Sequence, residues 1–409
     1  MVIGFYGTVA MPENLTRSSV EQVLRTNYME IVFVIALLIL LADLVNSLLT
    51  GSLTYSRLAT FTWDGLTVGL ALGLAGIGLS MTYSILGFAN VAHGDTMTAG
   101  TFVGWGVVFL LFGYGDAAFG ELLLLGVGGD LYASDLGISA LSRPLAVVAG
   151  ILATGAITAG IALVIDRFVY KPLREANSIM VLITSVGVAF LLRYLVVFFY
   201  KPSQRSLVVQ PESVVLGSID SVPVVAASRS ALQNGESIVA FPFALGGETN
   251  VLIQINTHEI LLIVVTVLLM IGLHVLLQRT RLGKSMRAMA DNPDLARSRG
   301  IPTERVIRWT WILGGSTTGI AGFLIVLERG TMSFQFGWLL LLLIFAAVVL
   351  GGIGSIYGAI VGGLVIGLTT TISLVWLPEA TFARPVAFLI MILVLVVRPQ
   401  GLFGGRIVG

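Results

Sequence analysis

The chain alternates between long apolar stretches and short polar connections. Runs such as GLTVGLALGLAGIGLSMTYSILGF (65–88) and IYGAIVGGLVIGLTTTISLVWL (356–377) contain no charged residue. About 20 apolar residues in a helix cover the hydrocarbon core of a bilayer, where backbone groups must bond within their own segment. The pattern therefore predicts an all-α polytopic membrane protein of about ten helices with Gly-rich broken segments. The ten expected segments are 29–49, 66–88, 96–113, 144–165, 178–200, 259–277, 310–327, 337–352, 354–377 and 383–398.

Composition supports this prediction and narrows the chemistry. Of 409 residues, 56% are hydrophobic and 11% are charged, against about 25% charged in soluble domains. The chain has no cysteine, so disulfides, thiolate metal sites and cysteine nucleophiles are excluded. A net charge of +1 lacks the excess of basic residues that is typical of nucleic-acid-binding proteins. We expect a protein of the cell membrane that is not an enzyme and holds no metal and no cofactor.

The distribution of basic residues predicts the orientation. Segment 279–308 carries eight Lys and Arg against three Asp and Glu, and is placed in the cytoplasm with the basic turn 166–176. The acidic stretches 114–143 and 201–257 are placed outside, which leaves both termini inside. The insertion 201–257 is expected to form a small cap, strands or a loosely ordered loop. The amino terminus lacks the basic-then-apolar order of a signal peptide, so span 29–49 is expected to stay as an anchor.

Glycines inside the spans recur at four-residue spacing, which places them on one helix face and lets a second helix approach closely. They favour packing within the chain, with a subunit interface as the alternative. The pairs and triplet are Gly69 with Gly73, Gly100 with Gly104, Gly315 with Gly319, and Gly354 with Gly358 and Gly362. The stretch GGIGS (351–355) differs, since tandem glycines interrupt a helix. A helix break is predicted at Gly351, Gly352, Gly354 and Ser355.

The stretch FANVAHGD (88–95) places polar groups between two apolar spans. Asn90 and His93 are three residues apart and would point the same way on a helical turn. Asp95 precedes the next span, where an acid would cap the helix. Three interpretations stay open: a hydrogen-bonded re-entrant turn, a place on a translocation path, and a proton relay. Candidate substrate-pathway residues are Tyr83, Asn90, His93, Gly94 and Asp95.

Two further charges lie within apolar spans. Intramembrane ionisable residues are costly and are functional candidates by default. Asp43, in LILLADLVNSLL, is expected to pair with a neighbouring helix that the sequence does not identify. Arg193, in VAFLLRYLVVFF, is nearer the outer end of its span and is expected to snorkel towards water.

The cytoplasmic segment 279–308 is patterned like two short helices. In AMADNPDLARSRG, Asn292 is expected to cap a turn that has Pro293 at its first position, and Gly300 is expected to stop it. Two short helices beneath a membrane bundle form a docking surface. The alternative is a basic loop bound to anionic lipid headgroups.

With these segments in view, the chain resembles branched-chain amino-acid ABC transporter permeases of the LivH type, from about residue 64 to the carboxyl terminus. The resemblance rests on the amino-acid sequences of five stretches and on their order along the chain. They are GLSMTYSILGFANVAHGD (78–95), IDRFVYKPLREANSIMVLITSVGVAFLLR (165–193), RLGKSMRAMADNPDLARSRGI (281–301), LGGIGSIYGAIVGG (350–363) and RPQGLFG (398–404).

The resemblance implies a permease that forms a pore with a second, homologous permease subunit. It also implies two cytoplasmic ATPase subunits below and an extracytoplasmic substrate-binding protein above, besides membrane lipid, with no nucleic acid. The implied ATPase-docking residues are Arg287, Ala288, Asn292, Asp294, Ala296, Gly300 and Ile301. The absence of a G-x-x-x-x-G-K-[ST] loop fits a subunit that transmits force and does not hydrolyse ATP.

The chain also departs from the family pattern. Residues 1–63 are interpreted as an amino-terminal extension with one extra transmembrane helix, and 64–409 as the permease domain. Tyr357 stands where the family commonly has proline, and insertion 201–257 is long. A branched-chain amino acid is favoured as cargo because residues 78–102 are mostly apolar. The alternatives are urea or a short amide as cargo, an ion-coupled secondary carrier, and a purely structural membrane anchor.

Overall fold

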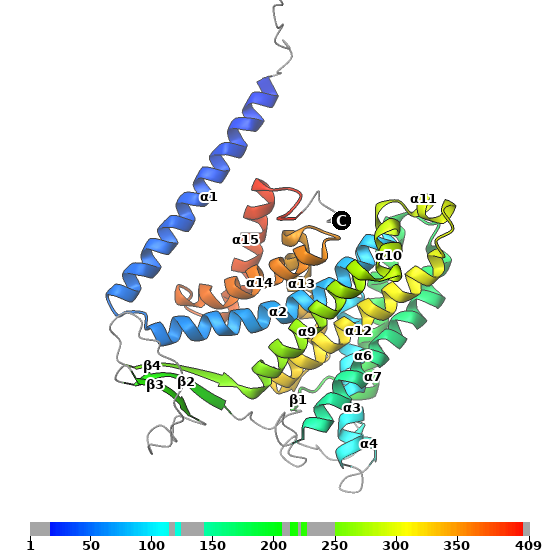
Figure 1. The fold of residues 1–409 in the computed structure, drawn as a ribbon, viewed down its shortest axis with the longest axis horizontal. Helices are drawn as coiled ribbons and strands as arrows, with labels where there is room; N and C mark the ends of the chain where they lie inside the picture. The colour runs from blue at the N-terminus through cyan, green and yellow to red at the C-terminus, as the bar shows by residue number, and fades with distance from the viewer. Residues whose placement is uncertain are drawn as a thin grey trace, which may run out of the picture.

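The computed structural model describes residues 17–113, 119–123, 143–206, 213–219, 222–226 and 250–403. Most of this part of the chain is helical (Figure 1). The α-helices are α1 (Arg17–Leu49), α2 (Tyr55–Leu86), α3 (His93–Gly113), α4 (Phe119–Leu122), α6 (Pro144–Ile165), α7 (Ser178–Tyr200), α9 (Thr257–Arg279), α10 (Arg281–Asp291), α11 (Pro293–Ser298), α12 (Thr303–Arg329), α13 (Phe336–Gly351), α14 (Ile356–Ile372) and α15 (Ala383–Val397). Short helical turns occupy Asp166–Tyr170, Lys171–Leu173, Ser373–Val375 and Ala380–Phe382.

All ten apolar segments expected from the sequence are helices, which confirms the fold class. Within the described ranges, eight helices are long and apolar enough to cross a membrane. The segments Val34–Leu49 and Phe336–Gly351 are shorter apolar helices. Several helices begin earlier than the apolar pattern does, because polar residues add turns beyond the hydrocarbon core: α2 starts at Tyr55 and α12 at Thr303. The expected domain boundary at 63–64 therefore falls inside α2.

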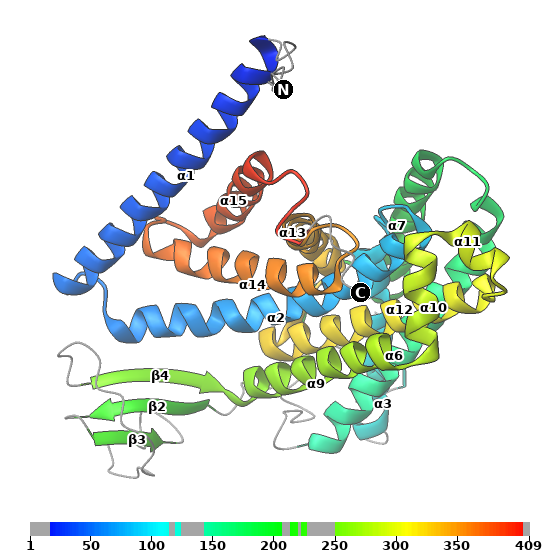
Figure 2. The ribbon, with the colours of Figure 1, turned by 45° about the horizontal axis from the view of Figure 1, so that its top comes forward.

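Helix α2 is the centre of the bundle. It contacts α9, α12, α13 and α14, and its residues 69–82 are all buried. In Figure 2, α14 runs along one side of α2 and α9 lies on its other side. The small residues of α2 make this close packing feasible, since a larger side chain would hold the neighbouring helices away.

Glycines mediate the closest helix contacts, which confirms the expected packing within the chain. A Cβ atom added to Gly69 would lie 2.8 Å from the Cα atom of Leu364, and one added to Gly363 would lie 2.7 Å from the Cα atom of Gly73. Gly104 in α3 and Gly319 in α12 pack against α6 in the same way. Helix α6 therefore lies against both α3 and α12.

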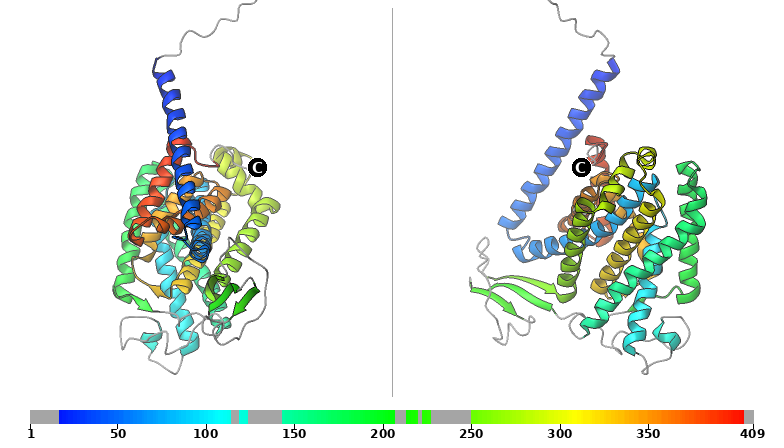
Figure 3. Two further views of the ribbon diagram at one scale, coloured as in Figure 1. Left: turned by 90° about the vertical axis from the view of Figure 1, so that its left-hand side faces the viewer. Right: turned by 45° about the vertical axis from the view of Figure 1, so that its right-hand side comes forward.

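Helix α1 lies at the edge of the molecule and projects away from the bundle (Figures 1 and 3). Its described apolar side chains between Val32 and Val45 are mostly exposed. The helix contacts α15. Trp376 donates its indole N–H to the Asp43 carboxylate, with a nitrogen–oxygen distance of 2.7 Å. The expected partner of Asp43 is thus a tryptophan just after α14.

The described part of the insertion 201–257 contains strands, one of the expected alternatives. Strands β2 (Ser213–Ile219), β3 (Val222–Ala226) and β4 (Asn250–Asn256) form an antiparallel sheet in the order β3-β2-β4. Ile219 pairs with Val222 on one side and Asn250 on the other. A two-stranded ladder joins β1 (Arg205–Ser206) to β5 (Thr331–Met332). Strand β4 leads directly into α9, where Asn256 and Glu259 form a capping box.

The sheet and the pair α10–α11 lie at opposite ends of the bundle (Figure 3). At the α10–α11 end, Arg174 donates to both carboxylate oxygens of Asp166 (3.0 and 2.9 Å) and also contacts Glu304. Lys171 lies 3.4 Å from Glu304. These contacts place the turn 166–176 and the segment 279–308 on one side of the molecule, as expected. That this side is cytoplasmic stays a prediction.

Candidate functional site

The polar stretch 88–95 forms the connection between α2 and α3. Helix α2 ends at Leu86, and Gly87 follows with φ +73°, a left-handed conformation that a residue with a Cβ atom rarely adopts. The Gly87 N–H donates to the Tyr83 carbonyl at 2.9 Å. Helix α3 then begins at His93, so His93 and Asp95 belong to its first turn. The stretch is therefore a tight turn between two buried helices.

Asn90 holds this turn together from inside. Its side-chain oxygen accepts hydrogen bonds from the Ala92 N–H at 3.1 Å and the Tyr170 hydroxyl at 3.0 Å. The neighbouring Val91 N–H donates to the Ser185 hydroxyl of α7 at 3.0 Å. Residues from beyond α6 and from α7 thus fix a turn between α2 and α3.

His93 is buried and lies between α2 and α12. Its Nε2 atom is 3.1 Å from the carbonyl oxygen of Ala75 and 3.2 Å from the Thr318 hydroxyl. Because a carbonyl oxygen can only accept, Nε2 carries a proton and donates to Ala75. These contacts join three helices through one imidazole.

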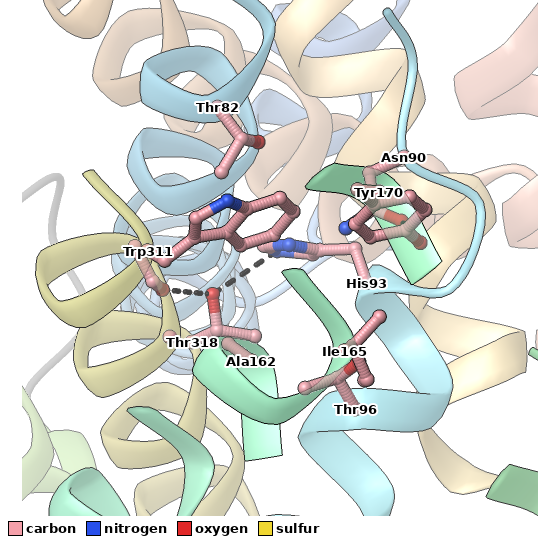
Figure 4. Close-up of a pocket in the computed structure, with 11 residues that line it drawn as sticks. Thr82, Asn90, His93, Thr96, Ala162, Ile165, Tyr170, Trp311 and Thr318 are labelled. Atoms are coloured by element: carbon pink, nitrogen blue, oxygen red, sulfur yellow. Dashed lines mark hydrogen bonds between the residues drawn. The ribbon is translucent and has the colours of Figure 1, made fainter. Parts of the chain in front are cut away.

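Asn90 and His93 line a small polar cavity, shown in Figure 4. Its volume is about 20 Å³, which is room for about one water molecule. Its other lining residues are Thr82, Thr96, Ala162, Ile165, Tyr170, Trp311, Gly314, Gly315 and Thr318. In this conformation the cavity is too small for an amino acid, so a place for Asn90 and His93 on the cargo path stays a prediction.

Asp95 pairs with Arg193, and the expected snorkelling of Arg193 is wrong. The guanidinium of Arg193 donates through Nε and Nη2 to the two Asp95 oxygens, each at 2.9 Å. The side chain of Asp95 is 0% exposed and that of Arg193 is 12% exposed. Arg193 also lies over the Trp338 ring, 4.5 Å from its centroid. The buried carboxylate offers the arginine a stronger partner than water at the bilayer surface.

Gly94 is a packing residue in this structure. A Cβ atom there would overlap the carbonyl oxygen of Gly337, and one on Gly337 would overlap Gly94 in turn. The Gly337 N–H donates to the Thr98 hydroxyl at 2.9 Å. The start of α3 is therefore in direct backbone contact with the start of α13.

Tyr83 belongs to a second and much larger cavity of about 510 Å³. This large cavity lies between α2, α9, α10 and α14 and extends to the carboxyl-terminal segment. Its lining residues are mostly apolar, with three methionines. They are Met81, Tyr83, Ser84, Ile85, Gly87, Met270, His274, Leu277, Gln278, Met286, Arg287, Ala290, Ile353, Gly354, Ser355, Ile356, Tyr357, Ile360 and Phe403. The five candidate pathway residues are thus separated: Tyr83 lines the large cavity, Asn90 and His93 line the small cavity, Gly94 makes a backbone packing contact and Asp95 forms an ion pair.

The predicted helix break is present and forms one wall of the large cavity. Helix α13 ends at Gly351, and Gly352 and Gly354 have φ values of +106° and +86°. The Ser355 hydroxyl accepts from the Gly358 N–H at 3.0 Å and caps α14.

The carboxyl-terminal segment completes the end of α13. The N–H groups of Leu402 and Phe403 donate to the carbonyls of Leu350 and Gly351, each at 2.9 Å. These carbonyls end a helix and lack partners within it. The segment around RPQGLFG therefore satisfies the polar end of a broken membrane helix.

The segment 281–301 has the two-helix structure expected from the sequence. Helix α10 ends at Asp291, and the next residue, Asn292, caps α11: its side chain accepts from the Leu295 N–H at 2.9 Å. Pro293 is the first residue of α11. Gly300 has φ +81°, and the Ile301 N–H donates to the Ala296 carbonyl at 3.1 Å. Both the cap and the stop signal are confirmed.

The proposed docking residues have different exposures. Asn292, Asp294 and Gly300 are exposed, Ala288 and Ile301 are partly buried, and Ala296 is buried. Arg287 is partly buried and lies on the wall of the large cavity. Leu295 is 55% exposed at the tip of α11 and was missed, although an apolar residue among polar neighbours could have indicated it.

Sequence reasoning also missed His274 and Gln278 in α9. They stand four residues apart in an otherwise apolar stretch, which places them on one helix face. This spacing was the available signal.

The comparisons with known proteins agree with this architecture. The sequence model of the family described as branched-chain amino acid transport system, permease component, matches residues 61–395. The chain is 29% identical over 342 residues to the high-affinity branched-chain amino acid transport system permease protein LivH of Salmonella typhimurium, covering 84% of this chain and 94% of that protein. It is 29% identical over 342 residues to BraD of Pseudomonas aeruginosa, a permease protein of the same description, covering 83% and 94%.

A shorter match links the chain to an archaeal protein. It is 35% identical over 146 residues to the probable branched-chain amino acid transport permease protein LivH of Methanocaldococcus jannaschii, covering 34% of this chain and 46% of that protein. No solved structure matches the chain. Because the family match spans most of the bundle, including α2, the helix break and α10–α11, the chain belongs to the family of permease components of branched-chain amino acid transport systems.

Proposed function

We propose that this multi-pass membrane protein is the transmembrane permease subunit of an ATP-driven importer of branched-chain amino acids. The observation that carries the proposal is the large cavity of about 510 Å³, whose wall includes α10. Ligand pockets in proteins are commonly about 300–1,000 Å³ and mostly apolar, with a few polar groups. A branched aliphatic side chain fits a lining of methionine, leucine and isoleucine.

The position of α10 supports a mechanical role. Met286, Arg287 and Ala290 of α10 line the cavity, and one residue, Asn292, separates α10 from α11. A movement of α11 is therefore transmitted to the cavity wall through a capped, hydrogen-bonded junction. In the proposed mechanism two cytoplasmic ATPase subunits bind α11, and their closure on ATP shifts α10 and changes access to the cavity.

Further partners follow from the same proposal. A second, homologous permease subunit completes the pore, and an extracytoplasmic substrate-binding protein delivers the cargo at the end that carries the β-sheet. The segment 279–308 and both termini then face the cytoplasm.

Gly300→Arg tests the proposal. At φ +81° a residue with a Cβ atom is strained, and arginine also places a bulky cation next to the end of α11. We expect loss of co-purification with the ATPase subunits and loss of ATP-dependent leucine uptake, with membrane insertion intact. Gly300→Asn is the matched control, because asparagine tolerates the left-handed conformation, and it should retain both properties.

Uptake assays also separate the alternatives. Vesicles that hold the assembled transporter should accumulate labelled leucine only with ATP and in preference to urea. Leucine accumulation by this chain alone without ATP would support a secondary carrier and reject the proposal. Preference for urea would reject the cargo while leaving the ATP-driven mechanism in place.

A further inference from the structure

A row of hydrogen-bonded polar side chains crosses one wall of the large cavity. Tyr357 of α14 has its hydroxyl oxygen 2.6 Å from His274 Nδ1 and 3.3 Å from Gln278 Nε2, both in α9. The Gln278 side-chain oxygen accepts a hydrogen bond from Arg287 of α10. We call these four residues the polar wall. They join three helices across a cavity whose other lining is mainly apolar.

The polar wall has a direction. The Arg287 guanidinium can only donate, so it occupies the Gln278 oxygen, and the Gln278 amide N–H then donates to the Tyr357 oxygen. The Tyr357 hydroxyl is left free to donate to His274 Nδ1. Each member polarises the next one, and the positive charge stands at the α10 end.

Among the described residues, Arg287 has no carboxylate partner. None of the ion pairs formed among the described residues includes it, whereas Arg174 and Arg193 each pair with a carboxylate. The Gln278 oxygen is neutral and uses only part of the guanidinium, which carries five N–H donors. A partly buried cation beside an apolar cavity is stabilised by an anion with bidentate geometry, which a carboxylate has.

We propose that Arg287 binds the carboxylate of a small aliphatic cargo in the large cavity, while Met81, Met270 and Ile360 contact its apolar side chain. The polar wall holds the guanidinium in place through Gln278. This inference rests on the proposed function and deepens it, because a carboxylate site selects an amino acid over urea or a neutral amide.

The absence of cysteine from the chain provides a direct test. Ser84 lines the large cavity, so Ser84→Cys introduces a single thiol there. In phosphatidylcholine nanodiscs, we expect L-leucine to slow modification of this thiol by a methanethiosulfonate reagent. Leucinol has the same side chain without the carboxylate and should protect much more weakly. Ser298→Cys, exposed on α11, is the labelling control and should react at the same rate with or without leucine.

The charge dependence is tested in the Ser84→Cys background. Arg287→Gln should raise the leucine concentration for half-protection about tenfold or more, the loss expected for a charge-assisted hydrogen bond. Arg287→Lys keeps the charge but loses the bidentate geometry, so it should protect better than Arg287→Gln and less well than arginine. Arg281→Gln removes an exposed arginine of the same helix that does not line the cavity. It should leave the leucine concentration for half-protection unchanged. Equal protection by leucine and leucinol, or equal effects of Arg287→Gln and Arg281→Gln, would overturn the proposal.

An anionic lipid headgroup is another source of an anion that Arg287 could bind. If adding phosphatidylglycerol to the nanodiscs protects the thiol through Arg287 and abolishes the leucine effect, the site belongs to lipid and the cargo assignment is overturned. Unchanged leucine protection in such nanodiscs supports it.

Transport assays distinguish failure of the carboxylate site from failure of the proposed importer function. ATP-dependent leucine uptake with an unchanged KM in Arg287→Gln would reject the carboxylate site and leave the importer intact. Absence of uptake by the unmodified assembly would reject the importer, whereas thiol protection would still report on the site.

Discussion

Arg193 of α7 donates two hydrogen bonds of 2.9 Å to the Asp95 carboxylate of α3, across 98 residues of sequence. Helix α7 packs against α3, and Arg193 also lies over Trp338 of α13. One buried ion pair thus joins a peripheral helix to two others. It also lies at the end of the turn that Ser185 of α7 supports, so α7 fixes the connection between α2 and α3 from two positions.

Replacing one partner of this pair should destabilise the fold strongly. Arg193→Met leaves a buried carboxylate without a counter-charge, and we expect a loss of about 3–5 kcal/mol in the free energy of unfolding. Reversible unfolding in detergent micelles measures it. The double variant Asp95→Leu with Arg193→Met removes both charges and should recover most of the loss. A double variant as unstable as the single one would show that packing of the arginine, and not its charge, is what matters.

The hydrogen bonds of Asn90 give a second prediction. Asn90→Leu leaves the Tyr170 hydroxyl and the Ala92 N–H without their acceptor inside the protein. Each buried unsatisfied group costs about 1–3 kcal/mol, so the variant should lose thermal stability. Tyr170→Phe removes only a donor and should lose less. If both variants keep the stability of the unmodified chain but Asn90→Leu stops uptake, Asn90 acts on the cargo and not on the fold.

The contact of Gly94 with Gly337 predicts a steep dependence on side-chain size. Gly337→Ala places a methyl group against the Gly94 carbonyl and should lower the midpoint of thermal unfolding by separating α3 from α13. Gly160→Ala is the matched control. A Cβ atom there meets open space, and alanine should stabilise α6 by about 0.5–1 kcal/mol. Equal effects at the two positions would contradict the close backbone contact.

The hydrogen bond from Trp376 to Asp43 should hold α1 near the bundle. Trp376→Phe removes the donor of the hydrogen bond that joins α1 to the segment after α14, so α1 should sample more positions. Spin labels on Val45→Cys in α1 and Leu389→Cys in α15 should show a broader distance distribution in this variant. Asp43→Asn keeps an acceptor oxygen and should preserve the narrow distribution. An unchanged distribution in Trp376→Phe would show that contacts with α15 alone position α1.

The end of α13 was predictable from the sequence only in part. The break at Gly351, Gly352 and Gly354 was predictable, because tandem glycines disfavour a continuous helix whatever surrounds them. That the N–H groups of Leu402 and Phe403 complete the end of α13 was not predictable, since about 50 residues separate the two segments. The orientation of the chain in the membrane and the ATPase-docking residues stay predictions.

The sequence by itself determined the helical spans, the cap at Asn292 and the stop at Gly300, because hydrophobic length and capping depend on residues close along the chain. Only the tertiary structure decided that Arg193 turns to Asp95, that Asn90 meets Tyr170 and that Arg287 faces a cavity. The partner of a buried polar group is set by which helix faces meet, and those faces are brought together by packing of the whole bundle.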